Sequence, residues 1–232
     1  MTHDAYFFDM DQTLTRSKSE IEGEHFKLLT KLAYNVPVVA VSGAVIQQMT
    51  KQLLSREIFY LAQNGNHAFT PGSPAGSCLW ENRLTEEEIA DITTHIYSLA
   101  RNFYKIDEST VQHRGCQVSF SCVGHDAPLD IKNKFDAKKI IRKTMLGMTP
   151  FEHPTLTVKI GGTTCFDYVR KNGTKGDNVK RFMDYLHLRN PIYIGDALFP
   201  GGNDDTVVGV CKTLQVDSVE ETYSFIKDEL AK

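Results

Sequence analysis

The sequence predicts an α/β protein with a doubly wound, parallel-sheet, Rossmann-like core and an inserted α+β cap domain. Near both ends of the chain, short apolar runs alternate with segments of helical periodicity, which is typical of strand–helix–strand units. Polar residues directly follow several of these runs, as they do at the carboxyl ends of parallel strands. Between them the pattern changes to strands and helices with short returns. We therefore expect a core of residues 1–81 and 171–232, and a cap of residues 82–170.

The overall composition is that of an ordinary globular protein. Of its 232 residues, 41% are hydrophobic and 24% charged, and the net charge is −3, so we expect neither nucleic acid nor a membrane as partner. No apolar run approaches the roughly 18 residues of a membrane span, and a signal peptide is not expected, which predicts a cytoplasmic location. Five scattered cysteines without a C-x-x-C pair indicate free thiols.

The predicted elements of the first core segment alternate between strand and helix. In chain order they are a strand over 5–8, a helix begun by a capping box at 19–22, a strand over 36–41, a helix over 44–54 and a strand over 58–62. Each strand ends at polar residues, which places those residues along one edge of a parallel sheet.

A Pro- and Gly-rich stretch at 71–77 is the best linker candidate. After it we expect, in order, a helix from Thr85 to about residue 102, a strand over 117–123, a helix over 130–146, and strands over 156–160 and 164–169. The core pattern then resumes with a helix opened by the loop 171–177, strands over 191–194 and 207–210, and a C-terminal helix capped at Ser218.

Two aspartates follow the first strand directly, Asp9 and Asp11. Carboxylates this close repel each other unless a cation screens them or one binds a proton. This favours a Mg²⁺ site in which Asp9 is both nucleophile and metal ligand, and Asp11 handles a proton. Taken alone, the motif is equally compatible with a polar turn after a strand.

Three further loops supply complementary groups. Ser42 and Gly43 follow the second strand and offer a hydroxyl and backbone N–H groups to a phosphate oxygen at a helix N-terminus. Lys175, in a Gly-flanked loop, can neutralise a phosphate or hold the nucleophile. Asp196 follows another strand as a second carboxylate for a metal, with two oxygen-bearing residues close behind it, Asn203 and Asp204. Because all fall at matching ends of one predicted sheet, the combination predicts phosphoryl transfer.

These segments resemble the four motifs of the haloacid dehalogenase superfamily and come in its order. They are residues 9–13, 41–43, 175 and 195–204, with the insert between the second and third motifs, as in the sugar-phosphatase branch with a large α/β cap. Within that branch the chain is most similar to eukaryotic-type phosphomannomutases. The supporting segments are 195–204, 63–65, 113–115, 121–125, 160–162 and 166–167.

The resemblance implies a mechanism and a set of roles. Asp9 would form an aspartyl-phosphate, Asp11 would act as acid and base, and Ser42 and Lys175 would bind the transferring phosphoryl group. Mg²⁺ would be held by the Asp9 carboxylate, the Asp11 main-chain oxygen and Asp196. Asn203 and Asp204 would orient the metal shell. The residues expected to contact the sugar phosphate are Lys18, Gly43, Asn64, Gly65, Arg114, His125 and Asp167.

Departures from the family pattern affect which reaction is expected. His125 ends the segment where the family has Ser-Pro-Ile-Gly-Arg, Lys18 stands at another arginine position, and Cys165 replaces a serine. Weaker binding of a second phosphate favours hydrolysis of the aspartyl-phosphate. The sequence therefore predicts a Mg²⁺-dependent sugar-phosphate phosphatase. A phosphomannomutase or phosphoglucomutase that uses a hexose bisphosphate is the alternative, and a non-catalytic sugar-phosphate-binding protein a minor one. A homodimer formed through the cap is left open.

Overall fold

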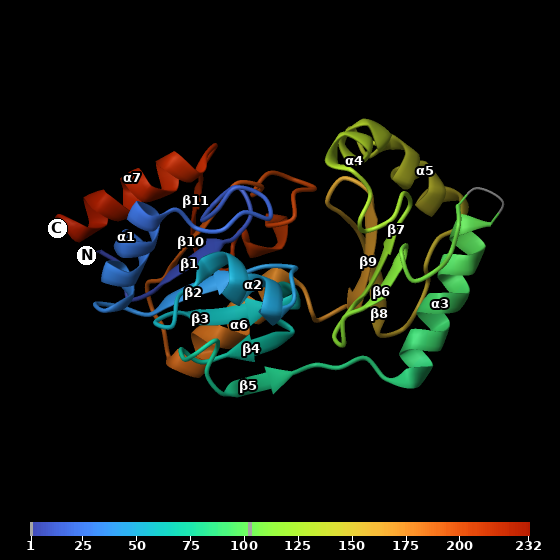
Figure 1. The fold of residues 1–232 in the computed structure, drawn as a ribbon. Helices are drawn as coiled ribbons and strands as arrows, with labels where there is room; N and C mark the ends of the chain where they lie inside the picture. Colours follow the sequence, from blue (N-terminus) through green and yellow to red (C-terminus); the bar gives the residue numbers. More distant parts are fainter. Residues whose placement is uncertain (1, 102–103) are drawn as a thin grey trace. The chain divides into compact units, whose positions relative to one another are not determined.

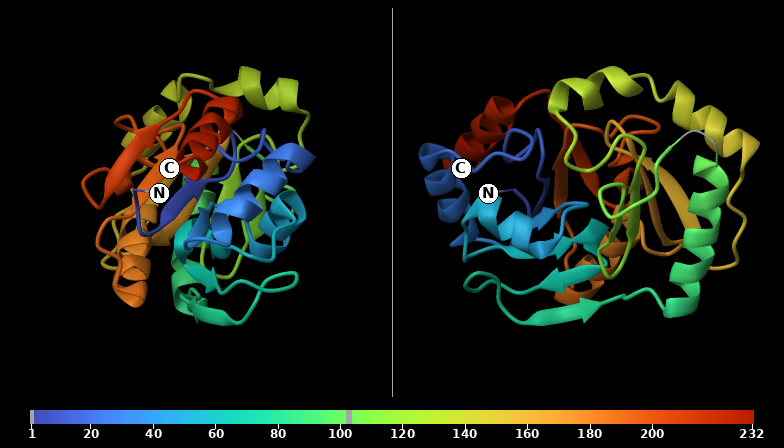
Figure 2. Two further views of the ribbon diagram at one scale, coloured as in Figure 1. Left: turned by 90° about the vertical axis from the view of Figure 1, so that its left-hand side faces the viewer. Right: turned by 45° about the vertical axis from the view of Figure 1, so that its right-hand side comes forward.

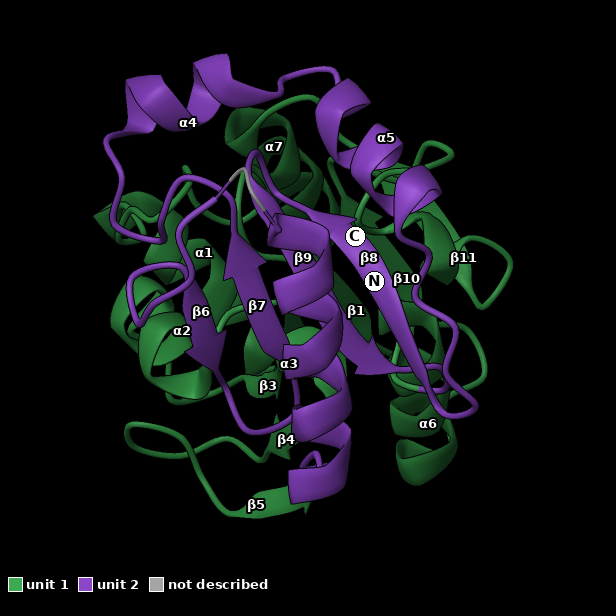
Figure 3. Ribbon diagram, turned by 90° about the vertical axis from the view of Figure 1, so that its right-hand side faces the viewer, with its two compact units in different colours: residues 1–81, 173–232 green, residues 82–172 purple. Residues whose placement is uncertain are grey.

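The computed structural model describes residues 2–101 and 104–232, and the chain forms two compact units (Figure 1, Figure 3). Unit 1 comprises residues 1–81 and 173–232, and unit 2 comprises residues 82–172. A mixed, mostly parallel sheet forms the centre of unit 1, and a separate antiparallel sheet forms the centre of unit 2. This confirms the predicted α/β fold class.

The sheet of unit 1 has seven strands in the order β11-β10-β1-β2-β3-β4-β5. In chain order they are β1 Tyr6–Asp9, β2 Val38–Val41, β3 Phe59–Ala62, β4 His67–Phe69, β5 Cys78–Glu81, β10 Ile192–Gly195 and β11 Lys212–Gln215. The first five in sheet order pair in parallel, and β4 and β5 add an antiparallel edge. Asp9 pairs with Val41, and Phe8 with Ile194, so the carboxyl ends of β1, β2 and β10 lie at one edge of the sheet.

Helices cover both faces of this sheet. They are α1 Gly23–Ala33, α2 Ile46–Leu53, α6 Lys175–Leu186 and α7 Val219–Leu230. Because side chains alternate along a strand, Tyr6 and Phe8 pack in the core shared with α1, α2 and α7, whereas Phe7 packs in the core shared with α6. The central strands are buried on both faces, which explains why they read as continuous apolar runs.

Three predictions for unit 1 outside the site residues are wrong. The capping box at 19–22 does not form, because α1 begins at Gly23 and its N-cap, Glu22, makes no side-chain capping bond. The stretch 71–77 is the loop of the β4–β5 hairpin and not a linker between the units. The strand expected over 207–210 is missing. Instead, Asp205–Val207 form a 3₁₀ turn, Gly209 has a φ of 88°, and the strand follows at β11.

Unit 2 is built on a four-stranded antiparallel sheet in the order β6-β7-β9-β8. Its elements are α3 Glu86–Ala100, β6 Val111–His113, β7 Val118–Ser121, α4 Leu129–Phe135, α5 Ile140–Met148, β8 Leu156–Gly161 and β9 Cys165–Arg170. Helix α3 lies against the sheet (Figure 3), and its Ile92 and Ile96 pack with Phe120 and Tyr168. The predicted end of α3 at residue 102 lies outside the described residues.

The single helix predicted over 130–146 is two helices separated by a buried ion pair. The carboxylate of Asp136 accepts hydrogen bonds from the backbone N–H groups of Ile141 and Arg142, so it caps α5. The Arg142 guanidinium, fully buried, donates to Asp136 at 2.9 Å and to the Gly161 carbonyl at 2.8 Å. These bonds connect α5 to the β8–β9 turn and separate α4 from α5.

A second buried carboxylate joins the two ends of unit 1, which lie side by side in Figure 2. Glu229 of α7 is 2% exposed and accepts hydrogen bonds from Thr2, through both its backbone N–H and its hydroxyl, from the Tyr6 hydroxyl and from Lys232. Burial alone would raise the pKa of Glu229, but the bonds from Lys232, Tyr6 and Thr2 outweigh it and lower that pKa to about 2.

We expect Glu229→Gln to lower the free energy of unfolding by about 2–3 kcal/mol at pH 7. The folded-state pKa is depressed, so this contribution is fully present above the unfolded-state pKa and disappears as the pH falls towards about 2. Urea unfolding of both proteins between pH 3 and pH 7 measures it. The exposed Glu24→Gln is the control and should change little. A pH-independent difference would contradict this assignment.

Among the described residues, no helix is long and apolar enough to cross a membrane.

Candidate active site

The predicted core residues gather at the carboxyl ends of the strands of unit 1. Asp9 is the last residue of β1, and Ser42 directly follows β2. Asp196 directly follows β10, and Lys175 is the first residue of α6. The parallel register therefore brings together groups that are up to 187 positions apart in sequence.

Lys175 stands at the centre of this cluster and is only 3% exposed. Its ammonium group donates one hydrogen bond to Asp9 Oδ1 and another, of 2.6 Å, to Asp204 Oδ1. Its place is set by a reciprocal capping box, because Thr174 accepts from the Asp177 N–H and the Asp177 carboxylate accepts from the Thr174 N–H. Of the two alternatives for Lys175, the structure places it on the carboxylate of the predicted nucleophile.

Asp204 is fully buried, and its two carboxylate oxygens differ in their contacts. Oδ1 accepts from Lys175 and, at 2.8 Å, from the Tyr193 hydroxyl. Oδ2 has no hydrogen-bond partner among the described residues. Gly195 makes room for it, because a Cβ at that position would lie 2.5 Å from Oδ2.

Three carboxylates in this cluster could hold a metal ion. Asp9, Asp196 and Asp204 each offer an oxygen, and these oxygens lie within 4.8 Å of one another. Hard carboxylate oxygens suit Mg²⁺, and the unpartnered Oδ2 of Asp204 is a buried acceptor that a cation would satisfy. The donor set therefore fits the predicted metal. Asn203 is exposed beside Asp204.

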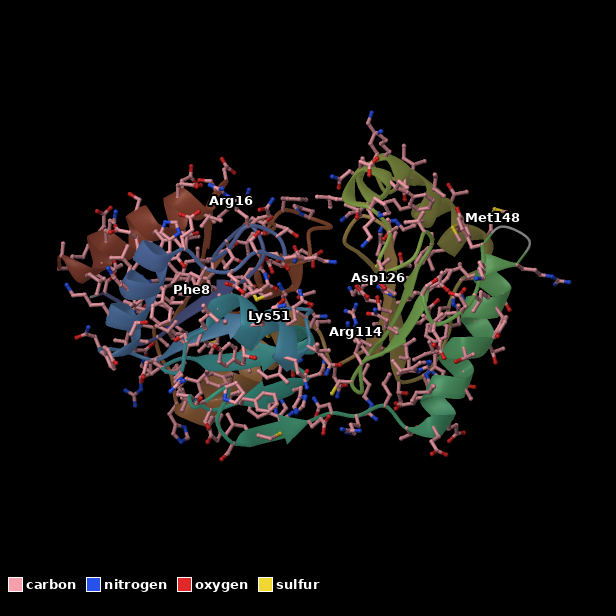
Figure 4. The ribbon with its side chains drawn as sticks, in the orientation of Figure 1. Phe8, Arg16, Lys51, Arg114, Asp126 and Met148 are labelled. Atoms are coloured by element: carbon pink, nitrogen blue, oxygen red, sulfur yellow. The ribbon has the colours of Figure 1, made fainter. Side chains whose placement is uncertain are left out.

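Next to Asp196 is a cavity of about 430 Å³, which gives this side of the cluster access to solvent. Its lining includes Gln12, Arg16, Ser218 and Glu220. Arg16 lies on the surface of unit 1, while Phe8 of β1 lies within its core (Figure 4). Water that completes a metal shell could enter from this cavity.

Burial and neighbouring charges shift the pKa values of the groups in this cluster. Burial raises the pKa of Asp9, Lys175 opposes this effect, and Asp204 and Asp196 add to it. Burial also raises the pKa of Asp196, with a further contribution from Asp204. Burial disfavours the charged form of Lys175, but Asp204 and Asp9 outweigh it and hold its pKa above the usual range. The single ammonium group thus hydrogen-bonds two of the three carboxylates, and a bound cation would add the positive charge that the cluster lacks.

Asp11 lies on a tight turn beside this cluster and is half-buried. The turn is closed by the Thr15 N–H on the Met10 carbonyl and the Gln12 N–H on the Thr15 carbonyl, with Gln12 at a φ of 64°. Asp11 Oδ1 accepts a 3.0 Å hydrogen bond from the backbone N–H of Lys18. Lys18 therefore contacts Asp11 through its backbone N–H, and the Lys18 side chain is exposed.

Ser42 is buried, but the prediction that it lies at a helix N-terminus is wrong. Helix α2 begins at Ile46 after the N-cap Val45. The Ser42 hydroxyl instead accepts a 3.1 Å hydrogen bond from the Ala44 N–H, and the Ser42 N–H donates to the Leu61 carbonyl. The loop after β2 is thus a serine turn, because this hydroxyl competes with helical pairing of the backbone.

Asn64 lies beside this loop, since a Cβ on Gly43 would be 3.5 Å from its side-chain oxygen. The turn Gln63–Gly65 is left-handed throughout, with φ values of 52°, 60° and 85°. Left-handed residues in succession are held only where the surroundings determine them. The predicted contact residues Gly43, Asn64 and Gly65 are therefore close to Ser42.

Three side chains that the sequence analysis missed fix this turn. The Trp80 indole donates to the Gly65 carbonyl at 2.8 Å, and Asn178 Nδ2 donates to the Asn64 carbonyl at 2.9 Å. Asn66 Nδ2 bridges to the Gly173 carbonyl at 2.8 Å, which links the turn to the loop before α6. The run of amide residues at 63–66 was the available sequence signal, because buried amides must find partners.

The remaining predicted contact residues, Arg114, His125 and Asp167, belong to unit 2. The sheet of unit 2 carries a polar row in register across its strands, made of Gln112, Ser119, Asp167 and Lys159. The Ser119 hydroxyl donates to Asp167 at 2.6 Å. The Arg114 guanidinium donates to Gln112 Oε1 at 2.9 Å, directly after β6 (Figure 4). This face is thus preorganised for polar contacts.

His125 is only 8% exposed and lies against the backbone of β7. Its Nε2 lies 3.1 Å from the Ser119 carbonyl, and since a carbonyl only accepts, Nε2 carries the hydrogen. Burial lowers the pKa of His125, and the bond to Ser119 offsets this only in part. The ring is therefore neutral near pH 7 and does not replace the positive charge of an arginine.

The model of the family described as eukaryotic phosphomannomutase matches residues 25–231. The chain belongs to this family. It is therefore an enzyme of the haloacid dehalogenase superfamily, and the chemistry of its family is phosphoryl transfer, as the motifs predict. Among curated relatives, a phosphomannomutase from Spinacia oleracea is 26% identical over 228 residues, 93% of this chain and 91% of that protein. Phosphomannomutase 1 from Dictyostelium discoideum is 27% identical over 235 residues, covering 95% and 94%.

Solved structures of lower identity share the fold. A protein from Streptococcus mutans superposes with a TM-score of 0.72 at 15% identity, covering 99% of this chain and 100% of that one. A haloacid dehalogenase-like hydrolase from Bacteroides thetaiotaomicron gives 0.62 at 14% identity, covering 98% and 99%. An IMP-nucleotidase from Plasmodium falciparum gives 0.67 at 14% identity, covering 99% of this chain and 67% of that one. At these identities the likeness shows the fold alone.

Proposed function

We propose that the protein interconverts hexose 1-phosphates and hexose 6-phosphates, as a phosphomannomutase, through an aspartyl-phosphate on Asp9. The observation that carries this proposal is the family match over residues 25–231, combined with a complete core cluster of Asp9, Lys175, Asp196 and Asp204. The family match favours this mutase, the alternative given above, over the sugar-phosphate phosphatase that the sequence predicts.

The reaction begins with phosphorylation of Asp9 by a hexose 1,6-bisphosphate. Asp11 then removes the proton of the 6-hydroxyl of a hexose 1-phosphate, and the 6-oxygen attacks the phosphorus as its bond to Asp9 breaks. The bisphosphate then reorients in the site so that its 1-phosphate faces Asp9, and Asp9 attacks the phosphorus of that group. Asp11 returns the proton to the leaving 1-oxygen, which releases the hexose 6-phosphate and leaves Asp9 phosphorylated for the next cycle.

The neighbours of Asp9 support this chemistry. Lys175 holds the Asp9 carboxylate in place and presents positive charge to the phosphoryl oxygens, while the buried Ser42 hydroxyl lies at the next strand end to bind one of them. Mg²⁺ held by Asp9, Asp196 and Asp204 would neutralise the charge on the transferring group. Asp11, on its turn outside the buried cluster, keeps the exposure that proton exchange with a substrate requires.

Unit 2 would select the substrate. We assign Arg114 to a phosphate, because a guanidinium offers several donors, and Asp167 to sugar hydroxyls. Both side chains are held by neighbours on the polar face, Gln112 and Ser119. A cytoplasmic location and a homodimer formed through unit 2 stay predictions.

Hydrolysis is the second candidate, favoured by His125. A mutase must keep the bisphosphate bound while this intermediate reorients. The neutral, buried His125 supplies no positive charge for that purpose. A bisphosphate that escapes would leave phosphorylated Asp9 to react with water, which gives the hydrolase outcome predicted from the sequence.

Incubation of the protein with mannose 1-phosphate, Mg²⁺ and a catalytic amount of hexose 1,6-bisphosphate, followed by ³¹P NMR, separates the two reactions. The proposal predicts conversion to the 6-phosphate, dependence on the bisphosphate, and little inorganic phosphate. Stoichiometric release of inorganic phosphate, with or without the bisphosphate, would overturn it in favour of the phosphatase. The Asp9→Asn variant, run in parallel, corrects for contaminating activities.

A further inference from the structure

We propose that the hydroxyl of Tyr193 is a positioning group for the metal site: together with Lys175 it occupies Asp204 Oδ1, and so turns Asp204 Oδ2 towards the cation. This inference deepens the proposed function, since it rests on the assignment of Asp9, Asp196 and Asp204 as the metal site. It concerns a residue that the sequence motifs do not include.

The position of Tyr193 under the cluster is well defined. It is fully buried in β10, and its ring packs in the core shared with α6, among Phe7, Val179 and Phe182. Its hydroxyl reaches out of this apolar layer to Asp204 Oδ1 at 2.8 Å. Strand β10 sets the position of this hydroxyl, because Tyr193 lies three residues before Asp196. The ring also packs closely against Gly195, since its Cε1 is 3.0 Å from where a Cβ on Gly195 would lie.

The two carboxylate oxygens of Asp204 differ in their contacts, and this difference leaves one of them available to a metal ion. A carboxylate can rotate about its last side-chain torsion, for which the preference is broad. Here two donors, Tyr193 and Lys175, meet one oxygen, and none among the described residues meets the other. The two donors therefore fix the plane of the carboxylate. They leave Oδ2 as a buried acceptor without a partner among the described residues, on a carboxylate that offers an oxygen within 4.8 Å of oxygens of Asp9 and Asp196.

The competing explanation is that Tyr193 only fills the core, and that its hydroxyl bonds to the nearest acceptor. Both explanations predict some loss of stability when the hydroxyl is removed. They differ in metal affinity, because groups that orient metal ligands typically change affinity by about 10–100-fold when removed. Metal affinity is therefore the property to measure.

The test compares Tyr193→Phe with Tyr60→Phe. Tyr60 is a matched control, since it is also fully buried in a core strand of unit 1 and donates its hydroxyl to a backbone carbonyl, that of Ser55, at 2.6 Å. Isothermal titration of the metal-free proteins with Mg²⁺ gives the Kd, and urea unfolding gives the stability. We expect the Kd to rise about 10–100-fold for Tyr193→Phe and to stay within about twofold of the wild type for Tyr60→Phe.

An unchanged Kd in a folded Tyr193→Phe protein would overturn the proposal. A measurement on the unaltered chain covers the case in which this variant does not fold. With 3-fluorotyrosine incorporated, the ¹⁹F signal of Tyr193 should shift on addition of Mg²⁺ and that of Tyr60 should not. An unmoved Tyr193 signal would also count against it. Neither readout needs a sugar phosphate, so this proposal and the mutase assignment can fail independently.

Discussion

Asp9→Asn is expected to abolish phosphoryl transfer, with a loss in kcat of at least about 10⁴-fold. An amide has nearly the shape of the carboxylate but cannot attack phosphorus, and it gives the metal site one charge less. Turnover of mannose 1-phosphate with a hexose bisphosphate and Mg²⁺, followed by ³¹P NMR, measures the effect. Asp228→Asn, an exposed aspartate of α7, is the matched control and should keep full activity.

The same change should leave the fold intact. Burial raises the pKa of Asp9, and Asp204 and Asp196 crowd it with like charge, so the neutral amide relieves part of an unfavourable arrangement. We expect the metal-free variant to unfold at the same urea concentration as the wild type or a higher one. Retention of more than about 1% of the wild-type kcat by a folded variant would place the nucleophile elsewhere.

Lys175→Met has the largest expected effect on stability, a loss of about 3–5 kcal/mol in the absence of Mg²⁺. Removing the ammonium group leaves the carboxylates of Asp9 and Asp204 buried, close together and without their shared donor. Activity should fall as well, because the phosphoryl group loses a positive partner. Urea unfolding of the metal-free protein measures the loss.

Added Mg²⁺ should restore more stability to Lys175→Met than it gives to the wild type, because a bound cation takes over the screening of these carboxylates. Lys180→Met is the control, since the Lys180 side chain makes, among the residues that the structure describes, a single exposed i,i+4 ion pair, with Asp184 on the same helix. That variant should stay within about 0.5 kcal/mol of the wild type with or without Mg²⁺. A loss below about 1 kcal/mol for Lys175→Met would show that the buried pair is not what balances the cluster.

Much of the core could be predicted from the sequence because it depends on local patterns. Strands buried on both faces are apolar runs, so β1, β2, β3 and β10 were found, and parallel pairing then places their polar successors at one edge. The sequence alone therefore predicts that Asp9, Ser42 and Asp196 lie close together. The short edge strands β4 and β5 are less apolar, and they were missed.

Features that depend on tertiary contacts could not be predicted in this way. The serine turn at Ser42 forms where the strand pattern suggested a helix start, since the hydroxyl pairs locally with the Ala44 N–H. The α4–α5 break depends on Arg142 reaching the β8–β9 turn, which lies about 20 residues further along the chain. Tyr193 reads as one more apolar strand residue, although a buried tyrosine hydroxyl needs a partner.

Chemical trapping tests most directly whether Asp9 carries the phosphoryl group. The protein is mixed for milliseconds with a hexose 1,6-bisphosphate and Mg²⁺, denatured, and treated with borohydride, which reduces an aspartyl-phosphate to homoserine. Mass spectrometry of the peptide that contains residues 5–15 then locates the change. We expect homoserine at position 9 in the wild type and none in Asp9→Asn. Homoserine at another aspartate, or at none during active turnover, would contradict this assignment.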